Sequence, residues 1–287
     1  MKEKKNKKRG KKFLKFMLVI LIVALVGGGA WHIYVRTESK KYNLISLDTS
    51  NLPEPLSAPS EETDIELNDF TMHYVKYGEG EKSVILIHGN GSSHKRLEEI
   101  ATYLGNYYTV YVPDSRCHGE STDPGVISYK LMAKDTAEFI DKLGLDKPYI
   151  MGHSDGGIIA LTFASMYPDK SAGIISCGAN SKPSTFKPYA TLSIYIDNFF
   201  KPDKLNDMML TLPDFTQEDF KKIKVPTYIV AAEFDMMWLS DTVYIHESIP
   251  QSKIAIIKMG NHSSYMSMNG KQGYVLAMKC LNEFEGK

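Results

Sequence analysis

Beyond residue 63, short apolar runs rich in β-branched residues alternate with longer segments that carry apolar residues at helical spacing. Runs such as 83–88 are continuously apolar, which is typical of strands buried on both faces of a sheet. Strands are predicted at 65–77 (two strands), 83–88, 108–112, 148–152, 173–177, 226–232 and 253–258. Helices are predicted at 97–104, 131–143, 156–166, 241–249 and 273–284. This alternation predicts an α/β protein whose mostly parallel central sheet is flanked by helices.

Residues 181–222 interrupt the alternation. They show no buried-strand pattern and are rich in aromatic residues and methionine. An insertion between two strands of such a sheet lies above its edge, so we predict a small helical cap after the sixth strand. The alternative is a pair of ordinary helices that pack on the sheet.

The N-terminal segment differs from the rest in charge and hydropathy. Residues 1–15 hold nine Lys or Arg and one Glu, a net charge of +8, and the remaining chain carries −8. No charged residue occurs in 16–31, and a helix over 16–35 would be about 30 Å long, enough to cross a bilayer. We expect a basic cytoplasmic tail (1–15) and a transmembrane signal-anchor (16–35). The positive-inside rule then makes this a single-pass protein of the cell membrane, with its C-terminal domain outside the cytoplasm.

A cleaved signal peptide is the competing interpretation of the same segment. Its apolar region would be 16–26, with Gly28 and Ala30 as the small residues before the cut, and the protein would be secreted. Residues 36–62, which contain several prolines, are expected to form a stalk or linker before a domain at 63–287. Because that domain is net acidic, its composition argues against nucleic-acid binding.

Neither the cysteines nor the glycines indicate a cofactor. Cys117, Cys177 and Cys280 are odd in number and far apart, so they predict no disulfide framework, and no Cys/His spacing resembles a metal site. The Gly-Asn-Gly segment at 89–91 follows a strand as in dinucleotide-binding proteins. The third glycine of that motif is replaced by His94, however. We therefore predict no metal and no cofactor.

A Gly-His-Ser-Asp-Gly pentapeptide at 152–156 follows a predicted strand and begins a predicted helix. In that context the pattern predicts a turn so sharp that Ser154 is strained and its hydroxyl is lifted out of the sheet. Gly152 and Gly156 flank the serine because a Cβ at either position would clash. The helix dipole favours negative charge at the same point.

A serine hydroxyl needs a base to become a nucleophile, and the base needs a carboxylate to orient it. Asp235 follows the strand at 226–232, and His262 follows the strand at 253–258. We therefore predict Ser154 as nucleophile, His262 as base and Asp235 as acid. The weaker candidates are Glu233 for the acid, which falls within the strand, and His246 for the base, which falls within a helix.

Four motifs together resemble the α/β-hydrolase superfamily over about residues 63–285. They are HGNGSS at 88–93, DSRCHGES at 114–121, GHSDGG at 152–157, and a two-part motif of AEFD at 232–235 with GNH at 260–262. The resemblance implies the α/β-hydrolase fold, with 181–222 as the cap that shapes the substrate pocket. It also implies an oxyanion hole formed by the backbone N–H groups of Asn90 and Asp155. Relatives often have glycine where this chain has Cys117, which raises the question of whether that loop keeps its conformation.

The expected function is hydrolysis of an acyl bond through an acyl-enzyme. A carboxylic ester of a small or medium apolar acid is the first prediction, because an aromatic, Met-rich cap suits an apolar acyl group. An amidase or aminopeptidase similar to proline iminopeptidase is the second, with Asp197, Asp203 or Asp207 holding a free amino group. Relatives with an Asp nucleophile, such as epoxide hydrolases, fit less well. A membrane-anchored binding module without activity is the alternative of another class.

Overall fold

The computed structural model describes residues 17–18, 27–266 and 269–287, so much of the predicted membrane segment, 16–35, lies outside the described residues. The chain divides into two compact units, Met1–Tyr42 and Asn43–Lys287. In the first unit, residues 27–39 form a helix in which the rings of Trp31 and Tyr34 are 5.7 Å apart. Within the described ranges, no helix combines the length and apolar character that crossing a bilayer requires.

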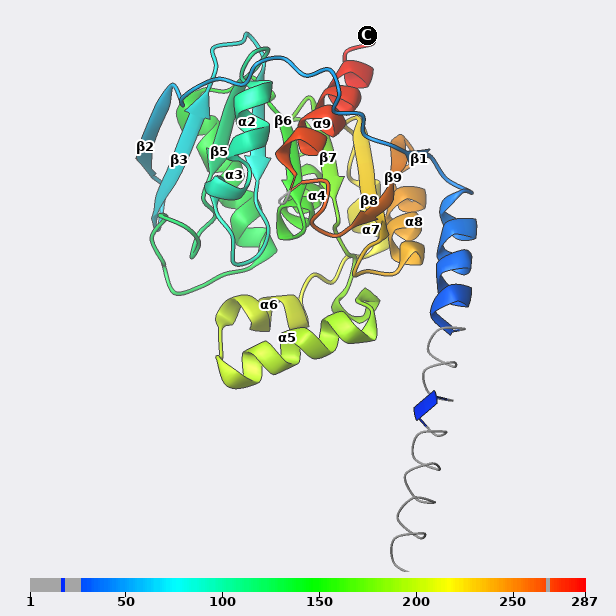
Figure 1. The fold of residues 1–287 in the computed structure, drawn as a ribbon. Helices are drawn as coiled ribbons and strands as arrows, with labels where there is room; N and C mark the ends of the chain where they lie inside the picture. The colour runs from blue at the N-terminus through cyan, green and yellow to red at the C-terminus, as the bar shows by residue number, and fades with distance from the viewer. Residues whose placement is uncertain (1–16, 19–26, 267–268) are drawn as a thin grey trace, which may run out of the picture. The chain divides into compact units, whose positions relative to one another are not determined.

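The second unit is built on a nine-stranded sheet with the order β1-β9-β8-β7-β6-β4-β5-β3-β2 (Figure 1). The β2–β3 and β3–β5 pairs are antiparallel and the remaining pairs are parallel. The strands are β1 (Leu44–Ile45), β2 (Glu61–Glu66), β3 (Thr71–Tyr77), β4 (Ser83–Ile87), β5 (Thr109–Pro113), β6 (Tyr149–His153), β7 (Gly173–Cys177), β8 (Thr227–Phe234) and β9 (Ser252–Asn261). The predicted mostly parallel sheet is confirmed.

Helices cover both faces of the sheet, and each face has its own apolar cluster. One face is covered by α3, α4, α7 and α8, and the other by α2 and α9. The bounds are η1 (His94–Arg96), α2 (Glu98–Leu104), α3 (Tyr129–Leu143), α4 (Asp155–Met166), α7 (Gln217–Lys221), α8 (Leu239–Ser248) and α9 (Gly270–Phe284). Local signals set these bounds: the Ser128 hydroxyl accepts a hydrogen bond from Leu131 N–H at the start of α3, and Gly144 ends that helix at φ +63°.

The segment between β7 and β8 divides into a cap and a return helix. It contains η2 (Pro183–Thr185), α5 (Pro188–Phe200), α6 (Lys204–Thr211) and α7. Figure 1 shows α5 and α6 apart from the helices that cover the sheet, and Asn198 on α5 donates a hydrogen bond to Asp207 on α6 at 2.8 Å. The α7 residue Phe220 is buried in the core. Of the range 181–222 that was expected to form a cap, α5 and α6 stand apart from the sheet, whereas α7 packs in the core.

The expected stalk at 36–62 differs from the structure from residue 43 onward. The compact unit begins at Asn43, and Leu44 in β1 pairs with Ile256 in β9. Leu56 packs on the core and its N–H donates to the Thr102 carbonyl at 3.0 Å. Single leucines at irregular spacing give no periodic signal, so the sequence pattern did not reveal that this segment packs on the domain.

Candidate functional site

The turn between β6 and α4 has the predicted geometry. Ser154 lies at φ +57°, in the left-handed region. A Cβ on Gly152 would lie 2.0 Å from the Gly156 carbonyl oxygen, and one on Gly156 would lie 2.1 Å from the Ile87 carbonyl oxygen. Both positions therefore require glycine. The Ser154 N–H donates to the Cys177 carbonyl at 2.7 Å, which ties the turn to β7.

Two loops bring the predicted base and acid to this serine. His262 Nε2 lies 3.0 Å from Ser154 Oγ, and His262 Nδ1 lies 2.7 Å from Asp235 Oδ1. Because the Asp235 carboxylate accepts a hydrogen bond from Nδ1–H, the neutral ring has its lone pair on Nε2, which accepts a hydrogen bond from the serine hydroxyl. Asp235 in turn accepts hydrogen bonds from the backbone N–H groups of Ala232 at 3.1 Å and Met236 at 2.7 Å.

The electrostatics of this pair suit proton transfer. Burial alone would lower the pKa of His262, but the adjacent Asp235 carboxylate outweighs it, so the pKa is raised above 6.5. Burial alone would raise the pKa of Asp235, and the imidazole and two backbone N–H groups reverse that effect, so the pKa is lowered. Asp235 therefore stays ionised and stabilises the imidazolium that forms when His262 takes a proton.

His153 holds the backbone of the base, His262, in place. The sequence did not indicate this contact with the base. Its Nε2 donates a hydrogen bond to the His262 backbone carbonyl at 2.7 Å, and the two ring centroids are 4.9 Å apart. Burial, together with the neighbouring His262, lowers the pKa of His153 to about 4. His153 is therefore neutral at pH 7 and fixes the loop that carries the base.

The two predicted oxyanion residues lie on two segments that are close to the serine. Asp155 is the first residue of α4, where a backbone N–H has no acceptor within the helix. Gly89 precedes Asn90, and a Cβ on Gly89 would lie 3.1 Å from Ser154 Cβ. The Asn90 side chain donates to the Leu205 carbonyl of α6 at 3.0 Å, so the same segment also contacts the cap.

The Asp155 side chain points into protein. Its Oδ1 accepts a hydrogen bond from the Tyr129 hydroxyl at 3.0 Å, and only 4% of the residue is exposed. Burial raises the pKa of Asp155 to about 6, although the Tyr129 hydrogen bond acts in the opposite direction. A carboxyl group with this pKa titrates close to neutral pH.

The loop that follows β5 holds Cys117 in a backbone conformation that usually requires glycine. Cys117 adopts φ +64°, a left-handed conformation that a side chain disfavours. The neighbouring Arg116 is buried and makes two hydrogen bonds of 2.6 Å to Asp135, and two longer ones to Asp69. Cys117 is a free thiol, as are Cys177 and Cys280. The arginine ion pairs thus hold a backbone conformation that glycine would adopt without strain.

The weaker candidates are engaged elsewhere. Glu233 lies in β8 and accepts a hydrogen bond from Met259 N–H at 2.9 Å. His246 lies on α8 and pairs with the Ser252 hydroxyl at 2.7 Å. In the cap, Asp203 caps the N-terminus of α6 and Asp207 accepts the Asn198 hydrogen bond. Asp197 is exposed on α5.

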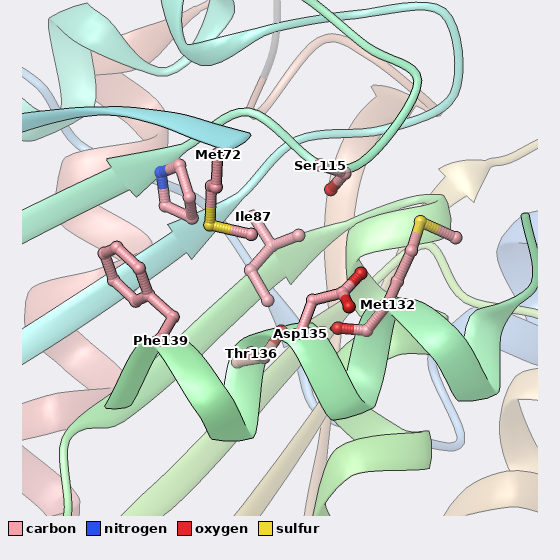
Figure 2. Close-up of a pocket in the computed structure, with 8 residues that line it drawn as sticks. Met72, Ile87, Ser115, Met132, Asp135, Thr136 and Phe139 are labelled. Carbon is pink, nitrogen blue, oxygen red and sulfur yellow. Dashed lines mark hydrogen bonds between the residues drawn. The ribbon is translucent and has the colours of Figure 1, made fainter. Parts of the chain in front are cut away.

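A small cavity lies between the sheet and α3 (Figure 2). Its volume of about 10 Å³ has room for no more than one water molecule. The lining residues are Met72, Ile87, Pro113, Ser115, Met132, Asp135, Thr136 and Phe139. Since none of them belongs to the Ser154 site, this cavity is a packing defect beside the Arg116–Asp135 pair and no substrate pocket.

Comparison with known proteins gives three kinds of match. The sequence profile of the α/β-hydrolase fold family matches residues 82–243. A soluble epoxide hydrolase of Corynebacterium sp. (strain C12) is 35% identical over 99 residues, which are 34% of each chain. An abhydrolase domain-containing protein of Schizosaccharomyces pombe is 31% identical over 137 residues, so these two curated relatives are matched over only 34% and 51% of their own length.

Solved structures match over more of the chain at lower identity. A thermophilic esterase from Thermogutta terrifontis, solved with malate bound, has a TM-score of 0.63 and 22% identity, covering 78% of this chain and 99% of that one. A putative lipase from Acinetobacter baumannii AYE has a TM-score of 0.66 and 19% identity, covering 79% and 92%. At these identities the likeness establishes the fold.

Proposed function

Because this chain belongs to the α/β-hydrolase fold family, we propose that it is a serine hydrolase that cleaves an acyl bond through an acyl-enzyme. The observation that carries the proposal is the continuous hydrogen-bonded series from Ser154 Oγ through His262 to Asp235, at 3.0 and 2.7 Å. These are the distances that a nucleophile, its base and the orienting carboxylate need.

In the proposed mechanism, Ser154 Oγ attacks the substrate carbonyl while His262 Nε2 takes the hydroxyl proton. Asp235 stabilises the imidazolium, and the N–H groups of Asn90 and Asp155 donate to the oxyanion. His262 then protonates the leaving group. Water, deprotonated by His262, attacks the acyl-enzyme and releases the acid and free Ser154.

We propose a carboxylic ester of a small or medium apolar acid as the substrate. The cap supports this choice, since Met208 of α6 and Ile194 of α5 are buried apolar residues and α5 exposes further aromatic side chains. An amidase or aminopeptidase is the second candidate. It has less support because Asp203 and Asp207 are engaged within the cap.

Epoxide hydrolysis has less support still, although a soluble epoxide hydrolase is among the matched relatives. Family members of that kind resemble this chain in fold but use an Asp nucleophile, and the corresponding position here is Ser154. Loss of activity with retention of a binding role is the remaining alternative, and the assay below separates it from an active hydrolase.

The assay compares the full chain in mild detergent with its Ser154→Ala variant, and with Ser171→Ala as a matched Ser-to-Ala control. The substrates are p-nitrophenyl esters of increasing acyl length and a set of aminoacyl p-nitroanilides. We expect ester turnover that disappears in Ser154→Ala alone, and labelling of Ser154 by a fluorophosphonate. Turnover of the nitroanilides without turnover of the esters would favour the second candidate, an amidase or aminopeptidase. Folded protein without turnover or labelling would refute the hydrolase and leave a binding module.

We also propose that residues 16–35 anchor the protein in the membrane, with the catalytic domain outside the cytoplasm. This rests on the basic block at 1–15 and the uncharged run at 16–31. Resistance of the native protein to carbonate extraction would support the anchor. A mature N-terminus near Ala30, found by N-terminal sequencing, would replace the anchor with a cleaved signal peptide.

A further inference from the structure

Four potential metal ligands converge at the edge of the sheet formed by β2 and β3. Glu62 lies on β2, His73 on β3, His94 in η1 and Glu120 in the loop after β5, and one ligand atom from each lies within 4.8 Å of the others. His73 Nε2 is 3.6 Å from Glu62 Oε1 and 3.9 Å from Glu120 Oε2. The sheet order places β2 and β3 at the opposite end from β8 and β9, which lead to Asp235 and His262.

Carboxylates hold both imidazoles of this cluster in place. His73 Nδ1 donates to Asp64 Oδ1 at 2.8 Å, its cross-strand neighbour, and His94 Nδ1 donates to Asp114 Oδ2 at 2.9 Å. In these tautomers each Nε2 carries a free lone pair. A carboxylate that holds the second ring nitrogen is the usual support of a histidine metal ligand, because it fixes the ring and increases its basicity.

His73 provides an independent sign of a missing partner. The residue is only 6% exposed, and within the described part of the chain its buried Nε2 has no hydrogen-bond partner. Buried polar atoms nearly always have partners, because leaving them unpaired costs stability. A metal ion between His73, Glu62 and Glu120 would satisfy this nitrogen.

Metal binding requires the ligand atoms to move closer together. Tetrahedral zinc with bonds of about 2.0–2.1 Å has ligand atoms about 3.3 Å apart, whereas His73 Nε2 lies 3.6 and 3.9 Å from the two glutamates and the four ligand atoms lie within 4.8 Å of one another. The Glu62 and Glu120 side chains are 51% and 47% exposed, so they are free to approach. Lys95 contacts Glu120 Oε1 at 2.9 Å, which leaves Oε2 for the metal.

We propose that Glu62, His73, His94 and Glu120 bind one divalent transition-metal ion, and that the ion is Zn²⁺. Two imidazole nitrogens and two carboxylate oxygens suit zinc better than magnesium or calcium, which prefer oxygen ligands alone. Four protein ligands fill the tetrahedron, so the site is structural.

The ion would connect β2 and β3 to the loops after β4 and β5. Asp114 already joins those loops, since it accepts hydrogen bonds from the backbone N–H groups of His94 at 2.6 Å and Glu120 at 2.8 Å. A Cβ on Gly119 would lie 2.0 Å from the same carboxylate, so the loop is closely fitted around it. Because His94 follows the loop that carries Asn90, the metal would also restrain that loop.

The test uses the full chain in mild detergent after EDTA treatment and dialysis. Calorimetric titration with Zn²⁺ should give one site per chain, and thermal unfolding should shift up by about 5–10 °C at a free Zn²⁺ concentration of 100 times Kd. Substitution with Co²⁺ should give the intense visible absorption of a four-coordinate ion.

Two variants distinguish binding at this site from nonspecific binding of cations to acidic residues. Glu62→Gln/Glu120→Gln changes exposed side chains, so it should fold without metal and bind Zn²⁺ at least about 100-fold more weakly. The control Glu61→Gln/Glu66→Gln also removes two negative charges, both on β2, and should bind Zn²⁺ with the affinity of the native chain. The proposal is overturned if no stoichiometric site appears, or if the ligand variant keeps the affinity and the thermal shift.

Discussion

Replacing Asp155 by asparagine should stabilise the protein at neutral and alkaline pH. Burial raises the pKa of Asp155 from its ordinary value of 3.8 to about 6 in the folded state. An acid with a raised folded pKa binds its proton more tightly in the native state, so its contribution to stability is present below pH 4 and is lost as the pH rises through 6. The difference between the folded and unfolded pKa values of Asp155 corresponds to about 3 kcal/mol of destabilisation of the folded protein above pH 7.

Asparagine removes this penalty and keeps the shape of the side chain. Its carbonyl oxygen replaces Oδ1 as the acceptor for the Tyr129 hydroxyl, at 3.0 Å in the native chain. Oδ2 is buried without a direct hydrogen-bond partner in the described residues, and the nearby Asn90 side chain acts to lower the pKa of this carboxyl group. An amide in its place loses that interaction and leaves an unpaired donor. This unpaired amide offsets at least about 1 kcal/mol of the gain, and we expect a net stabilisation of at most about 1–2 kcal/mol at pH 8 and none at pH 4.

The measurement is urea unfolding of both proteins between pH 4 and 8.5, followed by tryptophan fluorescence and circular dichroism. Asp146→Asn, at an exposed turn position, is the matched control and should show no such dependence on pH. Because the proposed catalytic role of Asp155 belongs to its backbone N–H, the variant should keep ester turnover within a few-fold. A stability difference that is the same at every pH, or a variant less stable than the native chain at pH 8, would refute the reasoning.

Three further predictions concern the base, its supporting histidine and the strained Cys117. The value of kcat/KM for p-nitrophenyl esters should fall as the pH drops through a pKa above 6.5, because the Asp235 carboxylate, acting against burial, raises the pKa of His262 and protonated His262 accepts no proton. His153→Leu removes the hydrogen bond to the His262 carbonyl, so kcat should fall about 10–100-fold. The pH at which kcat/KM falls should not change, since His153 is neutral, and His153→Gln should recover part of the rate. A change in that pH, or an unchanged kcat, would contradict the positioning role. Cys117→Gly should raise the free energy of unfolding by up to about 1 kcal/mol, because Cys117 is held at φ +64°; thermal denaturation would contradict this with an unchanged or lower Tm.

Local sequence signals were sufficient for much of the fold. The α3 helix starts at a residue that Ser128 caps and stops at Gly144, and both effects act within one turn of the chain. The β6–α4 turn follows from Gly152 and Gly156, whose missing Cβ atoms leave the space that it needs. The order of the strands was enough to predict Asp235 and His262 as partners of Ser154, because parallel strands end at the same edge of a sheet.

The tertiary structure decided the contacts between residues far apart in the chain. His153 and the His262 carbonyl lie 2.7 Å apart, and Glu62, His73, His94 and Glu120 form one cluster, yet neither set follows a spacing that resembles a motif. The packing of the segment that begins at Asn43 was hidden for the same reason. The sequence by itself determined what depends on local sterics, on helix caps and on the periodic burial of apolar residues. Long-range contacts depend on how strands and loops are placed in space, which leaves no periodic trace along the chain, so only the folded structure determined them.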